Sequence, residues 1–209
     1  MKQFLIIGGG GHSASVISAI EDKTEIHGIL NSFAKGDILG VPIIGNDSLL
    51  PDLLQNGINY FHVAIGDNSV RHKKFEECTQ KGMSPVTVID KTAAVDTGAT
   101  FGAGCFIGKN AVVNARASIG HNCIINSGSI IEHDCKIMES THCAPGSVLC
   151  GNVHVGRLCL IGANVTIFPG IRITDGVTIG AGSVVTKDLT IAGIYVGSPA
   201  KLLAKKEEL

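Results

Sequence analysis

Apolar residues recur at every sixth position along the C-terminal part of the chain. From Val86 the sequence divides without a gap into VTVIDK, TAAVDT, GATFGA, GCFIGK and so on to GSVVTK. The fourth residue of each six is apolar: Ile89, Val95, Phe101, Ile107, Val113, Ile119, Ile125, Ile131, Ile137, Cys143, Leu149, Val155, Ile161, Ile167, Ile173, Ile179 and Val185. A helical period of 3.6 cannot hold this register for about a hundred residues. A fixed repeat of six predicts a hexapeptide β-helix.

Each six supplies one short strand and one corner, so three sixes close a triangular coil. Coils stack at about the strand spacing of 4.8 Å, with the fourth residue pointing inward and a small second residue at the corner. Between five and six coils form a core that is stabilised by contacts between neighbouring coils. Residues eighteen apart are therefore predicted to stack on one edge of a prism.

The first part of the chain alternates between strand and helix patterns. Strands are predicted in QFLIIGGGGH, EIHGILN and YFHVAIGDN, helices in SASVISAIED and SVRHKKFEECTQKG, and a helix or turn pair in NDSLLPDLLQNG. Ser13 is the expected N-cap of the first helix. This alternation predicts a small Rossmann-like α/β domain over residues 1–84. The β-helix domain then spans residues 85–209 and includes a short C-terminal tail.

Composition narrows the functional classes. The chain has 209 residues and a formal net charge of −1, so it lacks the basic excess of a nucleic-acid binder. Its N-terminal apolar run is too short to span a bilayer and lacks the layout of a signal peptide. We therefore expect a soluble cytoplasmic protein without membrane insertion. The 27 glycines and the absence of Trp suit a backbone with many corners.

The seven cysteines form no C-x-x-C pair. Cys105, Cys123, Cys135 and Cys159 occupy second positions of the repeat, and Cys143 occupies a fourth position. We expect them to be small buried residues.

Glycines 8 to 11 lie where the first strand gives way to the first helix. Backbone N–H groups and the helix dipole at such a turn favour a phosphate. Ser13 stands where a third glycine would complete G-x-G-x-x-G, and Asn31-Ser32 replace an acid after the second strand. The turn therefore fits a nucleoside diphosphate better than a dinucleotide, and a tight turn without a ligand is the alternative. Gly66, in AIGDN, ends the third strand in the same way and could line the same crevice.

His133, within GSIIEHDCKI, is the candidate base. The period of eighteen stacks it between Ala115 and Gly151, so small neighbours leave the imidazole open to a substrate. A histidine beside a carboxylate is a suitable general base.

A stripe of small residues is predicted on another edge of the prism. It consists of Ser127, Pro145, Ala163 and Ala181. That stripe predicts a groove for a thin ligand such as pantetheine, unless corners merely favour small residues.

These segments together resemble a known family. GGGGH, AIGDNSVRHK, IINSGSIIEHDCKI, STHCAPGSVLCGNVHVG and YVGSPAKLL are similar to segments of bacterial nucleotide-amino-sugar N-acetyltransferases of the bacillosamine-pathway type, with sialic acid O-acetyltransferases as relatives. The resemblance implies a left-handed β-helix, a homotrimer with active sites between prisms, acetyl-CoA as co-substrate, and surface-glycan synthesis. It implies that His133 deprotonates the sugar amine, which attacks the thioester directly. The other residues it implies are Asp134 as the acid that supports the base and Asn126 to help place the amine. They also include His142, Gly151, Ala163 and Ala181 for the cofactor, and Gly10, His12, Asn31 and Gly66 for the nucleotide sugar.

Three alternatives remain open at this stage. An O-acetyltransferase acting on sialic acid or a related sugar would use the same base and cofactor. A zinc enzyme like the β-helical carbonic anhydrases would need three convergent ligands, and the spacing of His121, His133, His142 and His154 does not favour this, so we expect no metal. A nucleotide-binding scaffold without catalysis is the third alternative, which the intact EHD argues against.

Overall fold

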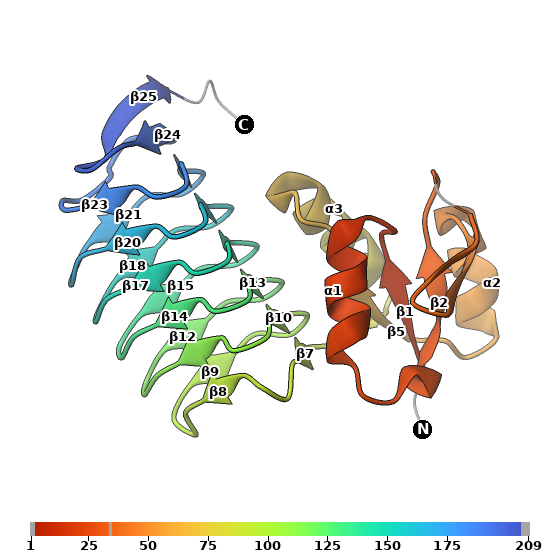
Figure 1. Cartoon of the computed structure of the whole chain (residues 1–209). Coiled ribbons are helices and arrows are strands. Elements are labelled where there is room, and N and C mark those ends of the chain that lie inside the picture. The colour runs from red at the N-terminus through yellow and green to blue at the C-terminus, as the bar shows by residue number, and fades with distance from the viewer. Residues whose placement is uncertain (1–2, 34, 206–209) are drawn as a thin grey trace.

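The computed structural model describes residues 3–33 and 35–205 and consists of an α/β domain followed by a prism of stacked strands (Figure 1). Residues 206–209 of the predicted C-terminal tail lie outside the described residues. Figure 1 shows the coils rising in order from β7, beside the N-terminal domain, to β23, with β24 and β25 covering the last coil. The predicted two-part fold class is confirmed.

The N-terminal domain is built on one six-stranded sheet with the order β3-β4-β2-β1-β5-β6. Its strands are β1 (Phe4–Ile7), β2 (Ile26–Leu30), β3 (Asp37–Ile38), β4 (Val41–Gly45), β5 (Tyr60–Val63) and β6 (Ser84–Pro85). Its helices are α1 (Gly11–Ala19), α2 (Leu50–Gln55) and α3 (Asn68–Gln80), with 3₁₀ turns at Lys23–Glu25 and Asp47–Leu49. All pairings are parallel except β3 with β4.

Two details of this domain differ from expectation. The β3–β4 hairpin was not predicted, because its strands are short and only partly buried and carry little apolar periodicity. The prediction of Ser13 as N-cap is wrong, since α1 begins at Gly11 with Gly10 as its cap. Ser13 is fully buried instead, and its hydroxyl donates to the carbonyl oxygens of Gly8 (2.7 Å) and Ala64 (3.2 Å). It therefore ties the ends of β1 and β5 together.

The prism contains seventeen two-residue strands within the described residues. They are β7 (Val88–Ile89), β8 (Ala94–Val95), β9 (Thr100–Phe101), β10 (Phe106–Ile107), β11 (Val112–Val113), β12 (Ser118–Ile119), β13 (Ile124–Ile125), β14 (Ile130–Ile131), β15 (Lys136–Ile137), β16 (His142–Cys143), β17 (Val148–Leu149), β18 (His154–Val155), β19 (Leu160–Ile161), β20 (Thr166–Ile167), β21 (Arg172–Ile173), β22 (Thr178–Ile179) and β23 (Val184–Val185). Strands β24 (Gly193–Val196) and β25 (Lys201–Lys205) form an antiparallel cap.

The predicted eighteen-residue period is confirmed by the register. Phe106 pairs with Ile124, and Ile130 pairs with Val148, so every third strand joins the same parallel sheet. Three sheets result, and we call them the first face (β7, β10, β13, β16, β19, β22), the second face (β8, β11, β14, β17, β20, β23) and the third face (β9, β12, β15, β18, β21).

The corners share one backbone conformation. From Gly104 to Gly182 the first residue of every six has a positive φ, including Arg116 (60°), Asp134 (62°) and Leu158 (55°). This left-handed conformation costs an L-residue strain that glycine avoids, which explains the many glycines and asparagines there.

Fourth-position side chains fill the prism as predicted from Ile107 to Val185. The earlier fourth positions are less buried, since Ile89 is 45% exposed and Val95 and Phe101 are partly buried. These residues belong to the first coil, which has no coil beneath it. The expectation that cysteines would be small buried residues is confirmed for Cys105, Cys123, Cys135, Cys143 and Cys159.

The outward residues differ between the three faces. Phe106 and Ile124 of the first face are buried against Val16 and Ile17 of α1, so the N-terminal domain covers this face. The third face carries polar residues: Thr100, Ser118, Lys136, His154 and Arg172. The second face carries mainly apolar and half-buried ones: Val112, Ile130, Val148, Thr166 and Val184.

Candidate active site

His133 lies at the corner that follows β14, on the edge between the second and third faces. Its side chain is 57% exposed, and its Nδ1 atom is 2.8 Å from Oδ2 of Asp134. Adjacent residues of a strand point in opposite directions, but Asp134 has a φ of 62° and is no longer in a strand. The left-handed corner therefore brings the two side chains to the same side. This is the geometry that a contact between them requires.

A third side chain completes this group. Arg116, one coil earlier on the same edge, donates from Nε to Oδ1 of Asp134 (2.6 Å) and from Nη2 to Oδ2 (2.8 Å). The pKa of the Asp134 carboxyl is held well below its usual value, first by the hydrogen bond from Arg116 and then by the one from His133. Since an ionised carboxylate is only an acceptor, the hydrogen bond places a proton on Nδ1 of His133, and in the neutral ring the lone pair is then on Nε2.

Gly151 makes room for the imidazole from the coil above. A Cβ atom placed on Gly151 would lie 2.6 Å from Cε1 and 2.7 Å from Nε2 of His133. The predicted stacking of His133 against small neighbours is thus present, and the ring fills the space that any side chain at position 151 would need.

A second cluster lies where the N-terminal domain meets the first face. Asn126 donates from Nδ2 to Nε2 of His142 (3.1 Å), and His142 also hydrogen-bonds to the backbone of Gly66. The ring of His12 packs edge-on against Phe106 at a centroid distance of 5.0 Å and lies 6.4 Å from that of His142. Four of the predicted site residues are therefore neighbours here: His12, Gly66, Asn126 and His142.

The histidines of this cluster are neutral. Burial lowers the pKa of His12 to about 3 and that of His142 to about 4, with the positive charge of Arg71 as a further cause in both. Nε2 of His12 is buried and has no hydrogen-bond partner among the described residues. A polar group of a bound ligand would satisfy it.

The glycine turn borders the same junction. Gly10 caps α1 and is exposed, and a Cβ on it would meet no atom within 4 Å. Asn31, at the end of β2, lies so close to Gly9 that a Cβ there would collide with its side chain. Gly10 and Asn31 therefore lie at the carboxyl ends of β1 and β2, where parallel sheets bind ligands.

Arg71 of α3 fixes this domain to the prism. This residue is 1% exposed, and its guanidinium donates to the carbonyl oxygens of Asn122 (3.0 Å) and Ser140 (2.8 Å) across the junction. It also donates to the carbonyl oxygens of Ile65 and Gly66 and to the side chain of Asn68. Sequence reasoning missed this role, because an arginine in a polar helix looks like a solvent-exposed residue.

The two clusters lie on different edges of one chain. Asn126 precedes β14 and His133 follows it, so Asn126 does not lie beside His133 within one protomer. Ala163 and Ala181 belong to the edge of Asn126, whereas Gly151 belongs to the edge of His133. The predicted role of Asn126 in placing the amine therefore stays a prediction. The stripe of small residues also lies on a different edge from the base.

Histidine side chains do not converge as the zinc alternative requires. Nδ1 of His121 accepts from the amide of Ala103 (2.9 Å), and Nδ1 of His154 accepts from Arg172 (2.9 Å). Over residues 3–33 and 35–205, no three His, Cys, Asp or Glu side chains are grouped as metal ligands. In the same residues no helix is both long and apolar enough to cross a bilayer.

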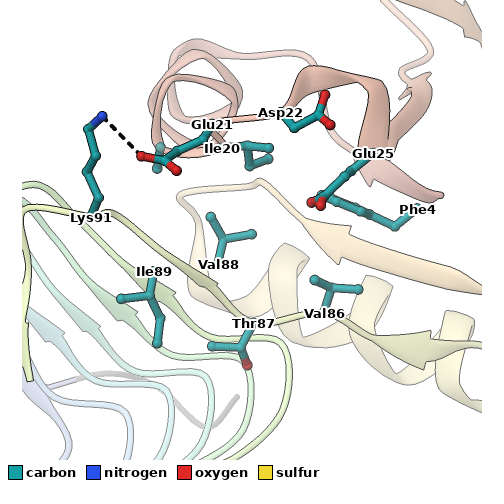
Figure 2. A pocket seen from close by; sticks show the side chains of 11 residues that line it. Phe4, Ile20, Glu21, Asp22, Glu25, Val86, Thr87, Val88, Ile89 and Lys91 are labelled. Carbon is teal, nitrogen blue, oxygen red and sulfur yellow. Dashed lines mark ion pairs between the residues drawn. The ribbon is translucent and has the colours of Figure 1, made fainter. Parts of the chain in front are cut away.

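A separate cavity of about 410 Å³ opens between the end of α1 and the first coil (Figure 2). Glu21 and Lys91 form an ion pair of 3.0 Å across its rim, and Ile20, Val88 and Ile89 line its apolar part. None of the predicted site residues lines this cavity, so it is not the predicted site.

Known proteins share both parts of this chain. Residues 3–78 match the family described as PglD N-terminal domain, residues 98–133 match the bacterial transferase hexapeptide, and residues 152–187 match the hexapeptide repeat of succinyl-transferase. The perosamine N-acetyltransferase of Caulobacter crescentus, a histidine-to-asparagine variant solved with CoA and GDP-perosamine, is 34% identical. Its TM-score is 0.92, and the match covers 97% of each chain.

Two further relatives extend the comparison. The acetyltransferase domain of PglB from Neisseria gonorrhoeae, solved with acetyl coenzyme A, is 29% identical with a TM-score of 0.90, and the match covers 97% of this chain and 99% of that one. The putative acetyltransferase YvoF of Bacillus subtilis is 41% identical over 59 residues, which are 28% of this chain and 34% of that protein's length.

The fold and these matches define a hexapeptide acyltransferase with an α/β N-terminal domain. The chain belongs to the left-handed β-helix N-acetyltransferase family of the perosamine and PglB type.

Proposed function

We propose that this protein transfers the acetyl group of acetyl-CoA to the amine of a nucleotide-linked amino sugar, with His133 as general base. The hydrogen-bonded His133–Asp134 pair carries the proposal, because it exposes an imidazole nitrogen at an open corner. The co-substrates named for the two solved relatives support the proposal: CoA with GDP-perosamine in one and acetyl coenzyme A in the other. We expect a cytoplasmic enzyme of surface-glycan synthesis.

The reaction needs one base and no acyl-enzyme. The nitrogen of the sugar amine attacks the thioester carbonyl while Nε2 of His133 accepts a proton from that amine. This step gives a tetrahedral intermediate. The C–S bond then breaks, the amide forms, and the departing thiolate takes up a proton from the imidazolium. Asp134 stabilises that imidazolium, and the backbone N–H of Gly151 is the proposed donor to the oxyanion. A general base of this kind contributes about 10²- to 10⁴-fold to the rate.

A homotrimer would bring the two clusters together. The outward apolar residues of the second face, such as Ile130 and Val148, need cover, and copies of this chain arranged about a threefold axis would provide it. In that arrangement, the edge with His133 of one copy meets the edge with Asn126 and His142 of the next. The base and the residues that place the amine would then come from neighbouring subunits.

Both substrates can be assigned binding positions on the proposed trimer. The nucleotide would lie against Gly10, Asn31 and Gly66, with His12 and Asn126 turned toward the sugar. The pantetheine arm would follow Ala163 and Ala181, reach past His142, and place its thioester near Gly151 of the neighbouring subunit. No metal is expected in this chemistry.

Thiol release from acetyl-CoA tests the activity directly. Purified protein is assayed against uridine-, guanosine- and thymidine-linked amino sugars, with free sialic acid as the substrate of the alternative O-acetyltransferase. We expect release with at least one nucleotide amino sugar, and a His133→Asn variant that is about 10²- to 10⁴-fold slower. His121→Asn, on another edge, is the matched control. Wild-type rates in the His133 variant would refute the mechanism.

Mixing two inactive variants tests the shared site. His133→Asn and Asn126→Ala chains are co-expressed with different tags, and mixed trimers are isolated. Each mixed trimer holds two chains of one variant and one of the other, so about one third of the interfaces regain both residues. Recovery of about a third of the activity supports a site between subunits, and no recovery would place the site within one chain.

A further inference from the structure

Arg116 holds the carboxylate of Asp134 with both oxygens engaged. Nε donates to Oδ1 and Nη2 donates to Oδ2, at 2.6 and 2.8 Å, and Oδ2 is also the atom that lies 2.8 Å from Nδ1 of His133. A planar guanidinium that binds both oxygens fixes the plane of the carboxylate as well as its distance. Arg116, which lies one coil earlier, therefore sets the orientation of the Asp134 carboxylate that faces His133.

The backbone holds Arg116 and Asp134 in register. Arg116 and Asp134 are first residues of sixes eighteen apart, both with φ near 60°, and the amide of Asp134 donates to the carbonyl oxygen of Ala115 at 3.1 Å. Most first positions of the repeat are glycine or asparagine, which adopt this conformation at lower cost. An arginine at such a position carries a backbone strain that glycine would avoid, and strain of this kind is often found at functional sites.

We propose that Arg116 is a positioning residue for acetyl transfer: it clamps Asp134 so that Oδ2 accepts the proton on Nδ1 of His133 and Nε2 stays free as the base. The proposal rests on the proposed function, because it assigns a role within the same site. Arg116 touches neither substrate in this role and acts through Asp134.

A purely stabilising ion pair is the competing explanation. The side chain of Arg116 is 70% exposed, and exposed pairs contribute little to stability because solvent screens them. The chain provides a matched pair for comparison. Arg157 binds Glu139, also eighteen residues away, at 2.8 Å on an edge without His133, and its side chain is 45% exposed. If both pairs only stabilise the prism, their removal should have the same effect.

The first test compares Arg116→Gln with Arg157→Gln in steady-state kinetics. We expect kcat of Arg116→Gln to fall about tenfold or more with KM for both substrates nearly unchanged, because the base is misplaced while binding is retained. Arg116→Lys should recover part of the loss, since an ammonium reaches one oxygen. Arg157→Gln should keep wild-type kcat. Equal kcat values for the two glutamine variants would overturn the proposal.

The second test reads the tautomer of His133 without any turnover. Histidine-labelled protein is examined by NMR at neutral pH, and the His133 signal is assigned by its absence in His133→Asn. We expect the Nδ1–H tautomer in the wild type and in Arg157→Gln, and a mixture of tautomers in Arg116→Gln. An unchanged tautomer in Arg116→Gln would overturn the proposal. A protein without acetyl transfer would refute the proposed function, and the tautomer would still decide the role of Arg116 toward His133.

Discussion

The imidazole of His133 lies in the space that a side chain on Gly151 would occupy. A Cβ atom on Gly151 would come within 2.6 Å of that ring, although the two residues are eighteen positions apart in sequence. The imidazole of the proposed base therefore fits only because position 151, in the next coil, has no side chain. The regular stacking of the β-helix fixes the distance between the two positions.

Replacement of Gly151 by alanine should displace His133. Because an error of about 1 Å in a catalytic group can cost about 100-fold, we expect kcat to fall by about that factor. The melting temperature should change little, since the ring can swing into solvent. Steady-state kinetics in the wild-type and His133→Asn backgrounds check this result. In the His133→Asn background the alanine at position 151 should lower kcat little further. An equal fall of kcat in both backgrounds would contradict the prediction.

Arg71→Met should loosen the N-terminal domain from the prism. The change leaves the buried carbonyl oxygens of Asn122 and Ser140 without their donor. We expect the free energy of unfolding to fall by about 3 kcal/mol or more. Chemical denaturation measures the loss, and Lys73→Met on the same helix is the control. Two separate transitions in the variant would fit an undocked domain, whereas a single wild-type transition would show that Arg71 does not hold the junction.

Val148→Arg should disrupt the proposed trimer. Val148 points outward from the second face, where an arginine in the centre of an apolar contact would be buried without a partner. Light scattering should give the mass of a trimer for the wild type and a lower mass for the variant, which should also lose acetyl transfer. Ser118→Arg, on the third face, should keep both. A wild type that is monomeric and active would remove the reason for a site between subunits.

Acid should destabilise the protein through its buried histidines. Burial is the first cause that lowers the pKa of His12 to about 3, and of His62 and His142 to about 4, from an ordinary value of 6.5. In the unfolded chain these side chains take up protons near pH 6.5. Between pH 6.5 and about 4 the unfolded state therefore binds more protons, and the free energy of unfolding falls as the pH falls.

Each such histidine contributes at most about 1.4 kcal/mol per pH unit in that window. Melting temperatures measured from pH 7.5 to about 5.5 check this, because that range lies above the ordinary pKa values of carboxyl groups, near which the unfolded chain would begin to protonate them. His62→Gln should make the decline less steep, since His62 is fully buried and donates to the carbonyl oxygen of Val86 at 2.8 Å. A melting temperature that does not change over this range would contradict the prediction.

The sequence by itself determined the repeat and all that follows from its period. The six-residue repeat predicts that fourth positions point inward, that second positions are small and that residues eighteen apart stack. His133 could therefore be placed against Gly151 without a structure. Arg116 was also within reach of the same prediction, because it precedes Asp134 by eighteen residues.

Only the tertiary structure decided which side chains from different elements meet. The left-handed φ of Asp134 turns its carboxylate toward His133, and its position in the repeat does not by itself show that the two side chains meet. The burial of Arg71 and the meeting of His12 with His142 depend on how the N-terminal domain docks on the first face. Docking depends on the fit of two surfaces remote in sequence, whereas a repeat is read from neighbouring positions, and this is why the prism was predictable and the junction was not.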